Sequence, residues 1–243
     1  MFRWGVLSTA KIGREQLLPA IADAAHEGGA TVLTDNTWAT PLYYKPLKLG
    51  ADIVVHAGTK YFGGHSDIML GTASATAATW PNLVQTHRTL GLTVGPDDAF
   101  LGLRGLRTLG IRLERQMASA LKVAAWLADR PEVGRVLHPA LPEDPGHALW
   151  KRDMTGASGL FAFTLAAWGD DEAKRLIDGL ELFGIGASWG GYESLATLAS
   201  KGLTRTVHPW PAGRPLIRVH IGLEDPDDLI ADLAASFERV AAG

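Results

Sequence analysis

Cysteine is absent from the 243 residues of this chain. Disulfide bonds, thiolate catalysis and cysteine metal sites are therefore excluded, and the composition is compatible with a reducing cytoplasm, where we expect the protein to be located. A surplus of positive charge is lacking too, since the net charge is -3 and the basic residues are spread along the chain. We therefore expect no nucleic-acid partner.

Long apolar runs are also missing. No uninterrupted apolar stretch reaches the roughly 20 residues that a membrane-spanning helix needs, so we expect no membrane partner. The first twelve residues lack the long apolar stretch and small-residue cleavage site of a signal peptide. What is present is an ordinary globular balance of 47% hydrophobic and 20% charged residues. The length suits two modest domains or one large domain.

Short apolar runs alternate with longer helical patterns, which indicates an α/β protein. Strands are expected at 31–34, 52–55, 68–75, 160–165 and 216–221, and helices at 15–25, 96–129 and 171–182. A closing helix follows, with Asp225 as its N-cap and Pro226 at its first position. Prolines and glycines make 138–159 a long connection, and a soft domain boundary is expected near Thr108.

Two charged residues, Asp35 and Lys60, each stand at or just beyond the carboxyl end of an expected strand. Open α/β sheets bind ligands along that edge. A carboxylate and an amine there could serve pyridoxal phosphate, because the lysine forms a Schiff base and the carboxylate pairs with the pyridinium nitrogen. Spacing alone favours a plainer interpretation, in which Asp35 caps a turn and Lys60 is a solvated surface residue.

Four longer motifs favour the cofactor interpretation over the plainer one. They read DNTWATP at 35–41, GTKYFGGHSD at 58–67, SWGGYESL at 188–195 and RVHIGLED at 218–225. In this order they resemble the two cofactor segments, the substrate loop and the carboxylate-binding strand of the Cys/Met-metabolism family of pyridoxal-phosphate enzymes. The resemblance runs from about residue 19 to the C-terminus. Trp38, Trp189 and His220 favour its cystathionine β-lyase branch over the γ-acting relatives.

The resemblance implies roles for individual residues. Lys60 is similar to the lysine that carries the cofactor and then moves the α-proton. Asp35 matches the partner of the pyridine nitrogen, and the Thr59 hydroxyl matches a phosphate contact. Ala57 stands where many relatives have a phosphate-binding serine, which leaves only backbone contact there.

The substrate side of the resemblance lies further along the chain. Arg218 is similar to the arginine that grips the substrate α-carboxylate, with an exposed edge residue as the weaker alternative. Ser188 and Trp189 match the loop beside that carboxylate, where Trp189 has a supporting role only. His65 is expected to hold the loop after Lys60 by hydrogen bonds.

Other histidines are given structural roles. His56 and His220 lie in apolar surroundings and are expected to be satisfied core residues. No group of histidine, aspartate and glutamate has convincing spacing for a metal ligand set, so no metal is expected.

The fold implied by the resemblance is the type I, aspartate-aminotransferase-like fold of pyridoxal-phosphate transferases. We expect a partial, N-terminally truncated large domain at 19–107 and a complete α+β small domain at 108–243. Residues 1–18 depart from the family and resemble the start of a glucose–fructose-oxidoreductase-type NAD(P)-dependent dehydrogenase. Ser8 and Ala10 replace two glycines of the usual fingerprint there, which leaves Gly13.

The function implied is that of a carbon–sulfur lyase of transsulfuration and methionine biosynthesis, acting on a small sulfur amino acid as a homotetramer. It would split cystathionine into homocysteine, pyruvate and ammonia. Because the relatives' N-terminal phosphate contacts and stacking tyrosine have no counterpart, we expect impaired activity in this chain. Two alternatives stay open: an NAD(P)-binding oxidoreductase fragment, and a non-catalytic remnant whose exposed sheet edge binds other chains.

Overall fold

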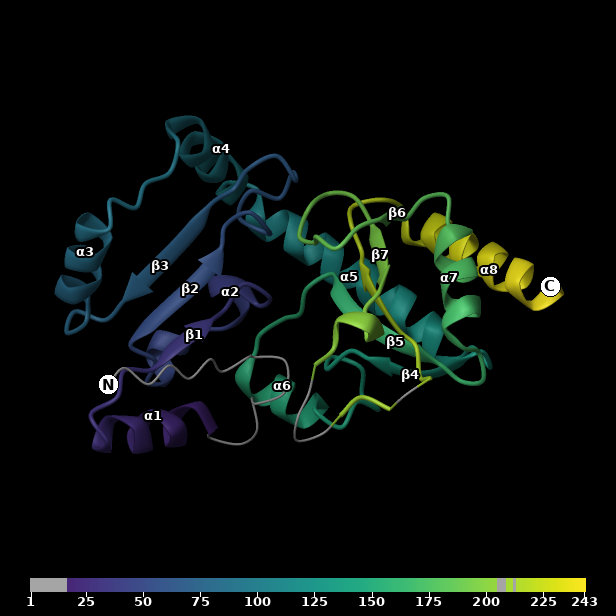
Figure 1. The fold of residues 1–243 in the computed structure, drawn as a ribbon, viewed down its shortest axis with the longest axis horizontal. Coiled ribbons are helices and arrows are strands. Elements are labelled where there is room, and N and C mark those ends of the chain that lie inside the picture. The colour runs from purple at the N-terminus through teal and green to yellow at the C-terminus, as the bar shows by residue number, and fades with distance from the viewer. Residues whose placement is uncertain (1–16, 205–208, 212) are drawn as a thin grey trace. The chain divides into compact units, whose positions relative to one another are not determined.

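Residues 17–204, 209–211 and 213–243 are described by the structure, a computed structural model (Figure 1). They form two units. The first unit comprises the described residues up to Gly110 together with Pro145–Ala157, and the second comprises Ile111–Asp144 with Ser158–Gly243. The predicted dehydrogenase-like start lies almost entirely outside the described residues.

A three-stranded sheet of order β1-β2-β3 is the centre of the first unit. Its strands are β1 (Leu33–Asp35), β2 (Ile53–Ala57) and β3 (Gly71–Ala75). β1 runs parallel to β2, and β3 runs antiparallel to it. The strands predicted at 31–34, 52–55 and 68–75 are thus confirmed in kind, with the third shortened at its start.

The helices of the first unit come before, between and after these strands in the sequence. They are α1 (Leu17–Glu27), α2 (Thr40–Tyr43), a 3-10 helix (Pro46–Leu49), α3 (Trp80–Thr89), α4 (Pro96–Leu106) and α6 (His147–Asp153). The region 138–159, predicted to be a long connection, does connect β4 (Val133–Leu137) to β5 (Leu160–Leu165), and it contains the short helix α6, which was not predicted. Just after α6, the Thr155 N–H donates to the Tyr43 carbonyl at 3.0 Å, which connects this segment to the rest of the first unit.

The helix predicted at 96–129 is two helices, α4 and α5 (Leu109–Ala128). The break follows from tight turn bonds, in which Arg107 N–H reaches the Arg104 carbonyl and Thr108 N–H reaches the Gly105 carbonyl. Three-residue spacing of this kind ends an α-helix. The predicted boundary residue Thr108 lies in this break, while the division of the chain into 1–18, 19–107 and 108–243 stays a prediction.

The second unit contains a five-stranded sheet of order β4-β5-β8-β7-β6. Its strands are β4 (Val133–Leu137), β5 (Leu160–Leu165), β6 (Gly184–Ile185), β7 (Leu195–Leu198) and β8 (Leu216–His220). β5 pairs antiparallel with β4 and β8, β7 pairs antiparallel with β8, and β6 runs parallel to β7. β5 and β8 confirm two predicted strands, whereas β4, β6 and β7 were not predicted.

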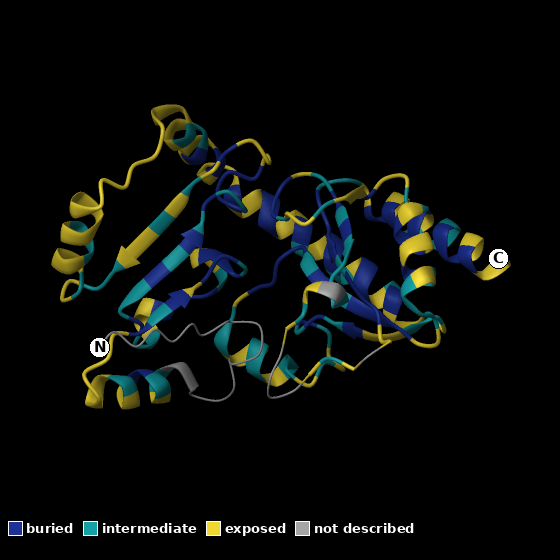
Figure 2. Cartoon of the chain, viewed as in Figure 1, coloured by how far each residue is buried: buried dark blue, intermediate teal, exposed yellow. Residues whose placement is uncertain are grey.

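Helices α5, α7 (Asp170–Asp178) and α8 (Pro226–Ala242) share one apolar core with these strands. β8 in the middle of the sheet is buried at four of its five residues, as Figure 2 shows. The predicted cap of the last helix is confirmed, because the Asp225 carboxylate accepts the Asp227 N–H at 2.8 Å and Pro226 follows it. Such a cap satisfies one of the unpaired N–H groups of the first turn.

No helix among the described residues is both long and apolar enough to span a membrane.

Candidate active site

Asp35 and Lys60 are brought to one edge of the first sheet. Asp35 is the last residue of β1 and pairs in register with Val55 of β2. Lys60 follows the end of β2 at Ala57 by three residues. Because β1 and β2 are parallel, their carboxyl ends meet at the same edge, where open α/β sheets bind ligands. The structure therefore places the predicted amine and the predicted carboxylate on neighbouring strand ends.

A short hydrogen-bond chain sets the backbone at this edge. The exposed Asp35 carboxylate accepts the Thr37 N–H through Oδ1 at 2.8 Å, as in an aspartate turn. The buried Thr37 hydroxyl accepts the Ala57 N–H at 2.8 Å, and the Ala57 carbonyl accepts the Lys60 N–H at 3.0 Å. Thr37 was missed from the sequence, although a threonine two residues after a strand-ending aspartate is a common turn signal.

The two residues predicted to contact a cofactor phosphate already have partners within the chain. The Thr59 hydroxyl accepts the Leu70 N–H at 2.9 Å and donates to the Leu70 carbonyl at 3.3 Å. The Ala57 N–H donates to the Thr37 hydroxyl. A phosphate would have to share these groups. Their roles in cofactor binding stay predictions.

His56 precedes Ala57 and is 7% exposed. Its ring stacks on Phe62, with centroids 5.0 Å apart and an interplanar angle of 25°. The Nε2 atom is buried and has no hydrogen-bond partner among the described residues, so the prediction of a satisfied histidine was wrong. Burial lowers the pKa of His56, and the negative charge of Asp35 opposes that shift only in part. The ring is therefore a neutral neighbour of the Asp35 carboxylate.

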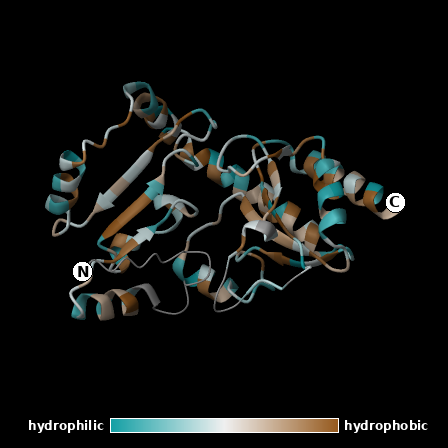
Figure 3. Cartoon of the chain, in the orientation of Figure 1, coloured by the Kyte–Doolittle hydropathy of each residue, from teal (hydrophilic) through white to brown (hydrophobic). Residues whose placement is uncertain are grey.

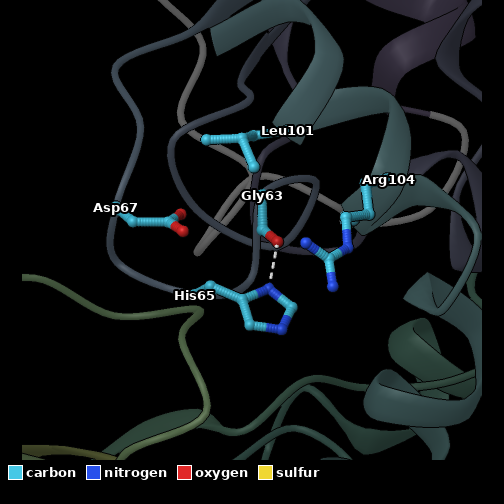
Figure 4. A pocket seen from close by; sticks show the side chains of 6 residues that line it. Gly63, His65, Asp67, Leu101 and Arg104 are labelled. Atoms are coloured by element: carbon cyan, nitrogen blue, oxygen red, sulfur yellow. Dashed lines mark hydrogen bonds between the residues drawn. The ribbon is translucent and has the colours of Figure 1, made fainter. Parts of the chain in front are cut away.

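The loop after Lys60 is held by His65, as predicted. Its Nδ1 lies 2.8 Å from the Gly63 carbonyl (Figure 4). A pocket of about 110 Å³ opens here, lined by Gly63, His65, Asp67, Leu101, Arg104 and Gly105. Ligand pockets usually measure roughly 300–1,000 Å³. We therefore assign no ligand to this small pocket.

Helix α4 approaches the same loop very closely. Gly102 and Gly105 are its buried residues. A Cβ added to Gly102 would lie 2.6 Å from Leu70 Cδ2, and one added to Gly105 would overlap the carbonyl oxygens of Phe62 and Gly63. Glycine at these two positions lets the helix pack against the backbone that follows Lys60.

The predicted substrate residues come together in the second unit. Arg218 lies on β8, and its Nη2 donates to the Ala187 carbonyl at 2.7 Å. Ser188 and Trp189 follow Ala187 directly, the first exposed and the second half-buried. Partial burial lowers the pKa of the Arg218 guanidinium, which nevertheless stays charged at neutral pH. A charged fork beside a loop is a suitable site for a carboxylate.

The loop between β6 and β7, residues 186–194, has further anchors that the sequence did not reveal. Gln116 of α5 donates from Nε2 to the Gly191 carbonyl at 2.6 Å. His220 Nε2 lies 3.1 Å from the Gly190 nitrogen and 3.2 Å from the Gly191 oxygen. The buried Nδ1 has no hydrogen-bond partner among the described residues, so the prediction of a satisfied His220 is confirmed at Nε2 and wrong at Nδ1. Nothing in the local sequence around Gln116 pointed to residues 75 positions away.

The end of this β6–β7 loop is fixed by a carboxylate. Glu224 accepts the Ser194 N–H at 2.7 Å and the Ser194 hydroxyl at 2.8 Å. The Ser194 oxygen in turn accepts the Gly222 N–H at 2.9 Å. The segment that follows β8 therefore holds the loop that precedes β7.

No group of three metal-ligating side chains comes together in the described parts of either unit.

The chain is similar to known proteins in sequence. The profile of the Cys/Met metabolism PLP-dependent enzyme family matches residues 15–238. A cystathionine beta-lyase from Bordetella avium is 47% identical over 226 residues, which are 92% of this chain and 57% of that protein. The cystathionine beta-lyase of Escherichia coli K12 is 46% identical over 229 residues, or 92% of this chain and 58% of that protein.

A solved structure is similar along almost the whole chain. Cystathionine gamma synthase from Xanthomonas oryzae pv. oryzae, in complex with aminoacrylate and cysteine, matches with a TM-score of 0.88 at 36% identity. The match covers 98% of this chain and 63% of that one. The chain thus spans less than two thirds of the length of the relatives it matches. These sequence and structural similarities do not favour the alternative of an NAD(P)-binding oxidoreductase fragment.

Proposed function

This chain belongs to the Cys/Met metabolism PLP-dependent enzyme family, and from that membership we propose that it acts as a carbon–sulfur lyase of the cystathionine β-lyase type. The proposed substrate is cystathionine, split by α,β-elimination into homocysteine, pyruvate and ammonia. The observation that carries the proposal is the meeting of Asp35 and Lys60 at one sheet edge. It occurs in a chain that is 46–47% identical to named cystathionine beta-lyases.

The residues at the sheet edge fit pyridoxal phosphate by their chemistry. When bound, this cofactor supplies an aldehyde that condenses with an amine and a protonated ring that withdraws electrons. Lys60 offers the amine, and after release it can take the α-proton and deliver a proton to the departing sulfur. Asp35 offers the carboxylate that holds the proton on the ring nitrogen. Thr37 keeps the two strand ends together through Ala57.

The second unit offers the groups for the substrate carboxylate. Arg218 presents a half-buried guanidinium whose orientation is fixed by the Ala187 carbonyl. Partial removal from water strengthens its attraction for an anion. Ser188 and Trp189 border that group and would limit the space around it. Arginine suits this task better than lysine, because its planar fork can hold both carboxylate oxygens.

Reductive trapping tests the cofactor lysine. The purified chain would be incubated with pyridoxal phosphate, treated with borohydride and digested, and the modified lysine would be mapped by mass spectrometry. We expect the label on Lys60 and its loss in Lys60→Ala, whereas Lys48→Ala, which removes a lysine on the 3-10 helix of the same unit, should be labelled normally. A label that persists in Lys60→Ala would overturn the proposal.

Product analysis tests the reaction. With L-cystathionine we expect a thiol and pyruvate in equal amounts, and Lys60→Ala should lower the rate at least about 10²–10⁴-fold, the usual contribution of a positioned acid–base group. Formation of a different oxoacid would contradict the β-elimination. The predicted homotetramer and cytoplasmic location stay predictions, and light scattering and cell fractionation test them.

A further inference from the structure

The β6–β7 loop is held at its middle by two buried residues from elsewhere in the second unit. Gly190 has φ of 87°, a left-handed conformation that favours glycine. Its N–H faces His220, and the carbonyl of Gly191 faces Gln116. His220 is 1% exposed and Gln116 is 0% exposed. Two successive backbone groups of this loop are therefore bound by side chains that water does not reach.

The donors and acceptors of this group allow one consistent arrangement. The Gly191 carbonyl oxygen can only accept a hydrogen bond, so Gln116 must present its side-chain NH₂ group to it rather than its side-chain oxygen. That oxygen is then satisfied without His220. The Gly190 N–H needs an acceptor, and the 3.1 Å contact supplies one if His220 Nε2 carries a lone pair. With Nε2 accepting the Gly190 N–H, His220 is neutral and its proton is on Nδ1, a buried atom with no hydrogen-bond acceptor among the described residues.

Strand β8 connects these contacts to the substrate arginine. Side chains two residues apart on a strand lie on the same face, so Arg218 and His220 point to one side of β8. Arg218 binds the carbonyl of Ala187 and His220 binds the N–H of Gly190, which are the residues on either side of Ser188 and Trp189. The orientation of the guanidinium and the position of the loop are thus set by the same strand.

We propose that His220 and Gln116 are positioning residues that hold the Gly190–Gly191 backbone, and thereby keep Ser188 and Trp189 beside Arg218 for binding the substrate carboxylate. Neither residue touches the reacting atoms. The proposal rests on the carbon–sulfur lyase function for its reaction but on the contacts within the second unit for its geometry. It can therefore be tested with and without turnover.

Hydrogen exchange tests the geometry in the full chain. We expect the Gly190 amide to be protected, and His220→Phe to speed its exchange about tenfold, the effect of losing one hydrogen bond. His220→Gln, whose side-chain oxygen can accept the same N–H, should restore most of the protection. The matched control is His138→Phe, because His138 is a fully buried histidine of the same unit that contacts Ala140 and Phe161.

Equal exchange at Gly190 in all these variants would overturn the proposal. The tautomer supplies a measurement that needs no destabilising substitution. In the folded chain labelled with ¹⁵N-histidine, the Nε2 resonance of His220, identified by its absence in His220→Gln, should be that of an unprotonated nitrogen. A protonated Nε2 would contradict the assigned network even if His220→Phe failed to fold.

Steady-state kinetics with L-cystathionine distinguishes a loss of loop positioning from a general disturbance of the core of the second unit. We expect His220→Phe and Gln116→Met to raise KM about tenfold while kcat changes much less, because the carboxylate grip is weakened and Lys60 is untouched. His138→Phe should leave KM near that of the parent chain. If the chain shows no lyase turnover while Gly190 exchange behaves as expected, the proposed reaction fails and the positioning stands. Unchanged KM in both variants of an active chain would refute the positioning.

Discussion

The two units differ most in how much apolar surface they bury. Twenty buried residues form the core of the second unit, with contributions from α5, α7, α8 and four strands. In the described part of the first unit the core cluster has four buried members, namely Ala22, Val32, Ala51 and Val54. Its β3 and α3 are mostly exposed in Figure 2, although β2 is hydrophobic over most of its length in Figure 3.

Most of the exposed large apolar side chains among the described residues lie in the first unit. Met69 is 78% exposed there, and Leu90 and Phe100 are each 64% exposed, although Ile111 and Ile185 of the second unit are 75% and 67% exposed. The amine and carboxylate proposed for the chemistry belong to this thinly packed unit, whereas the proposed substrate groups belong to the densely packed one. The two sets of proposed residues therefore lie in units that differ in how densely they are packed. The packing of each unit can be tested by substitution.

The largest effect is expected from the core of the second unit. Phe237 is fully buried, with ring centroids 5.9 Å from Trp168 and 6.2 Å from Trp126. Phe237→Ala should lower the free energy of unfolding of this unit by about 3–5 kcal/mol. Val54→Ala, in the small core of the first unit, removes two methyl groups and should cost only about 1–2 kcal/mol. Urea unfolding followed by tryptophan fluorescence measures both, and equal losses would contradict the difference in packing between the units.

A pH effect should also appear in the second unit. Burial lowers the pKa of His138 to about 4, with Asp144 and a backbone bond opposing the shift. An unfolded histidine titrates near 6.5. As pH falls below 6.5 the unfolded state takes up the proton first, so stability present above 6.5 is lost progressively toward pH 4. The full loss is at most about 3 kcal/mol.

The check on this pH effect is His138→Asn, whose side-chain oxygen can still accept the Ala140 N–H that His138 Nδ1 binds at 3.2 Å. Unfolding free energies measured between pH 7 and pH 4 should fall less steeply in this variant than in the parent chain. If the two chains lose stability in parallel over that range, the His138 ring is not the source of the pH effect.

A further effect, in the first unit, is expected where α4 meets the loop after Lys60. Gly105→Ala would overlap the Phe62 and Gly63 carbonyls, and overpacking of this kind costs about 1–3 kcal/mol. The displaced loop should also reduce trapping of pyridoxal phosphate on Lys60. The control is Gly110→Ala, whose Cβ would come no closer than 3.9 Å to Leu42 Cδ1 and should stabilise its helix by about 0.5–1 kcal/mol. Equal trapping in both variants would show that the glycine contact does not position the lysine loop.

Much of the second unit was predictable, and the reason is local. β5 is an almost continuous apolar run, and β8 is apolar apart from Arg218 and His220. Helix α8 begins at Asp225 and Pro226, whose preferences act over one turn. The short strands β6 and β7 escaped prediction because two and four residues hold too little pattern. The break between α4 and α5 escaped it because the apolar stripe continues on both sides.

The residues of the candidate site also fall into those that local sequence predicted and those that it did not. Asp35, Lys60 and Arg218 were found because their motifs are contiguous in the sequence. Thr37, His56 and Gln116 acquire their roles only through partners 20 or more residues away or through burial itself. Such contacts have no local pattern, so sequence reasoning could not assign them.

Residue order alone was enough to establish the family, the cofactor chemistry and the strand ends that bear the charged residues, because these depend on neighbouring residue types and on short-range backbone preferences. Three-dimensional packing was needed to show which side chains bind the β6–β7 loop, why Gly105 lies against the lysine loop and how unevenly the apolar surface is buried. Those features arise from contacts between distant segments, where a fraction of an ångström separates a contact from a collision.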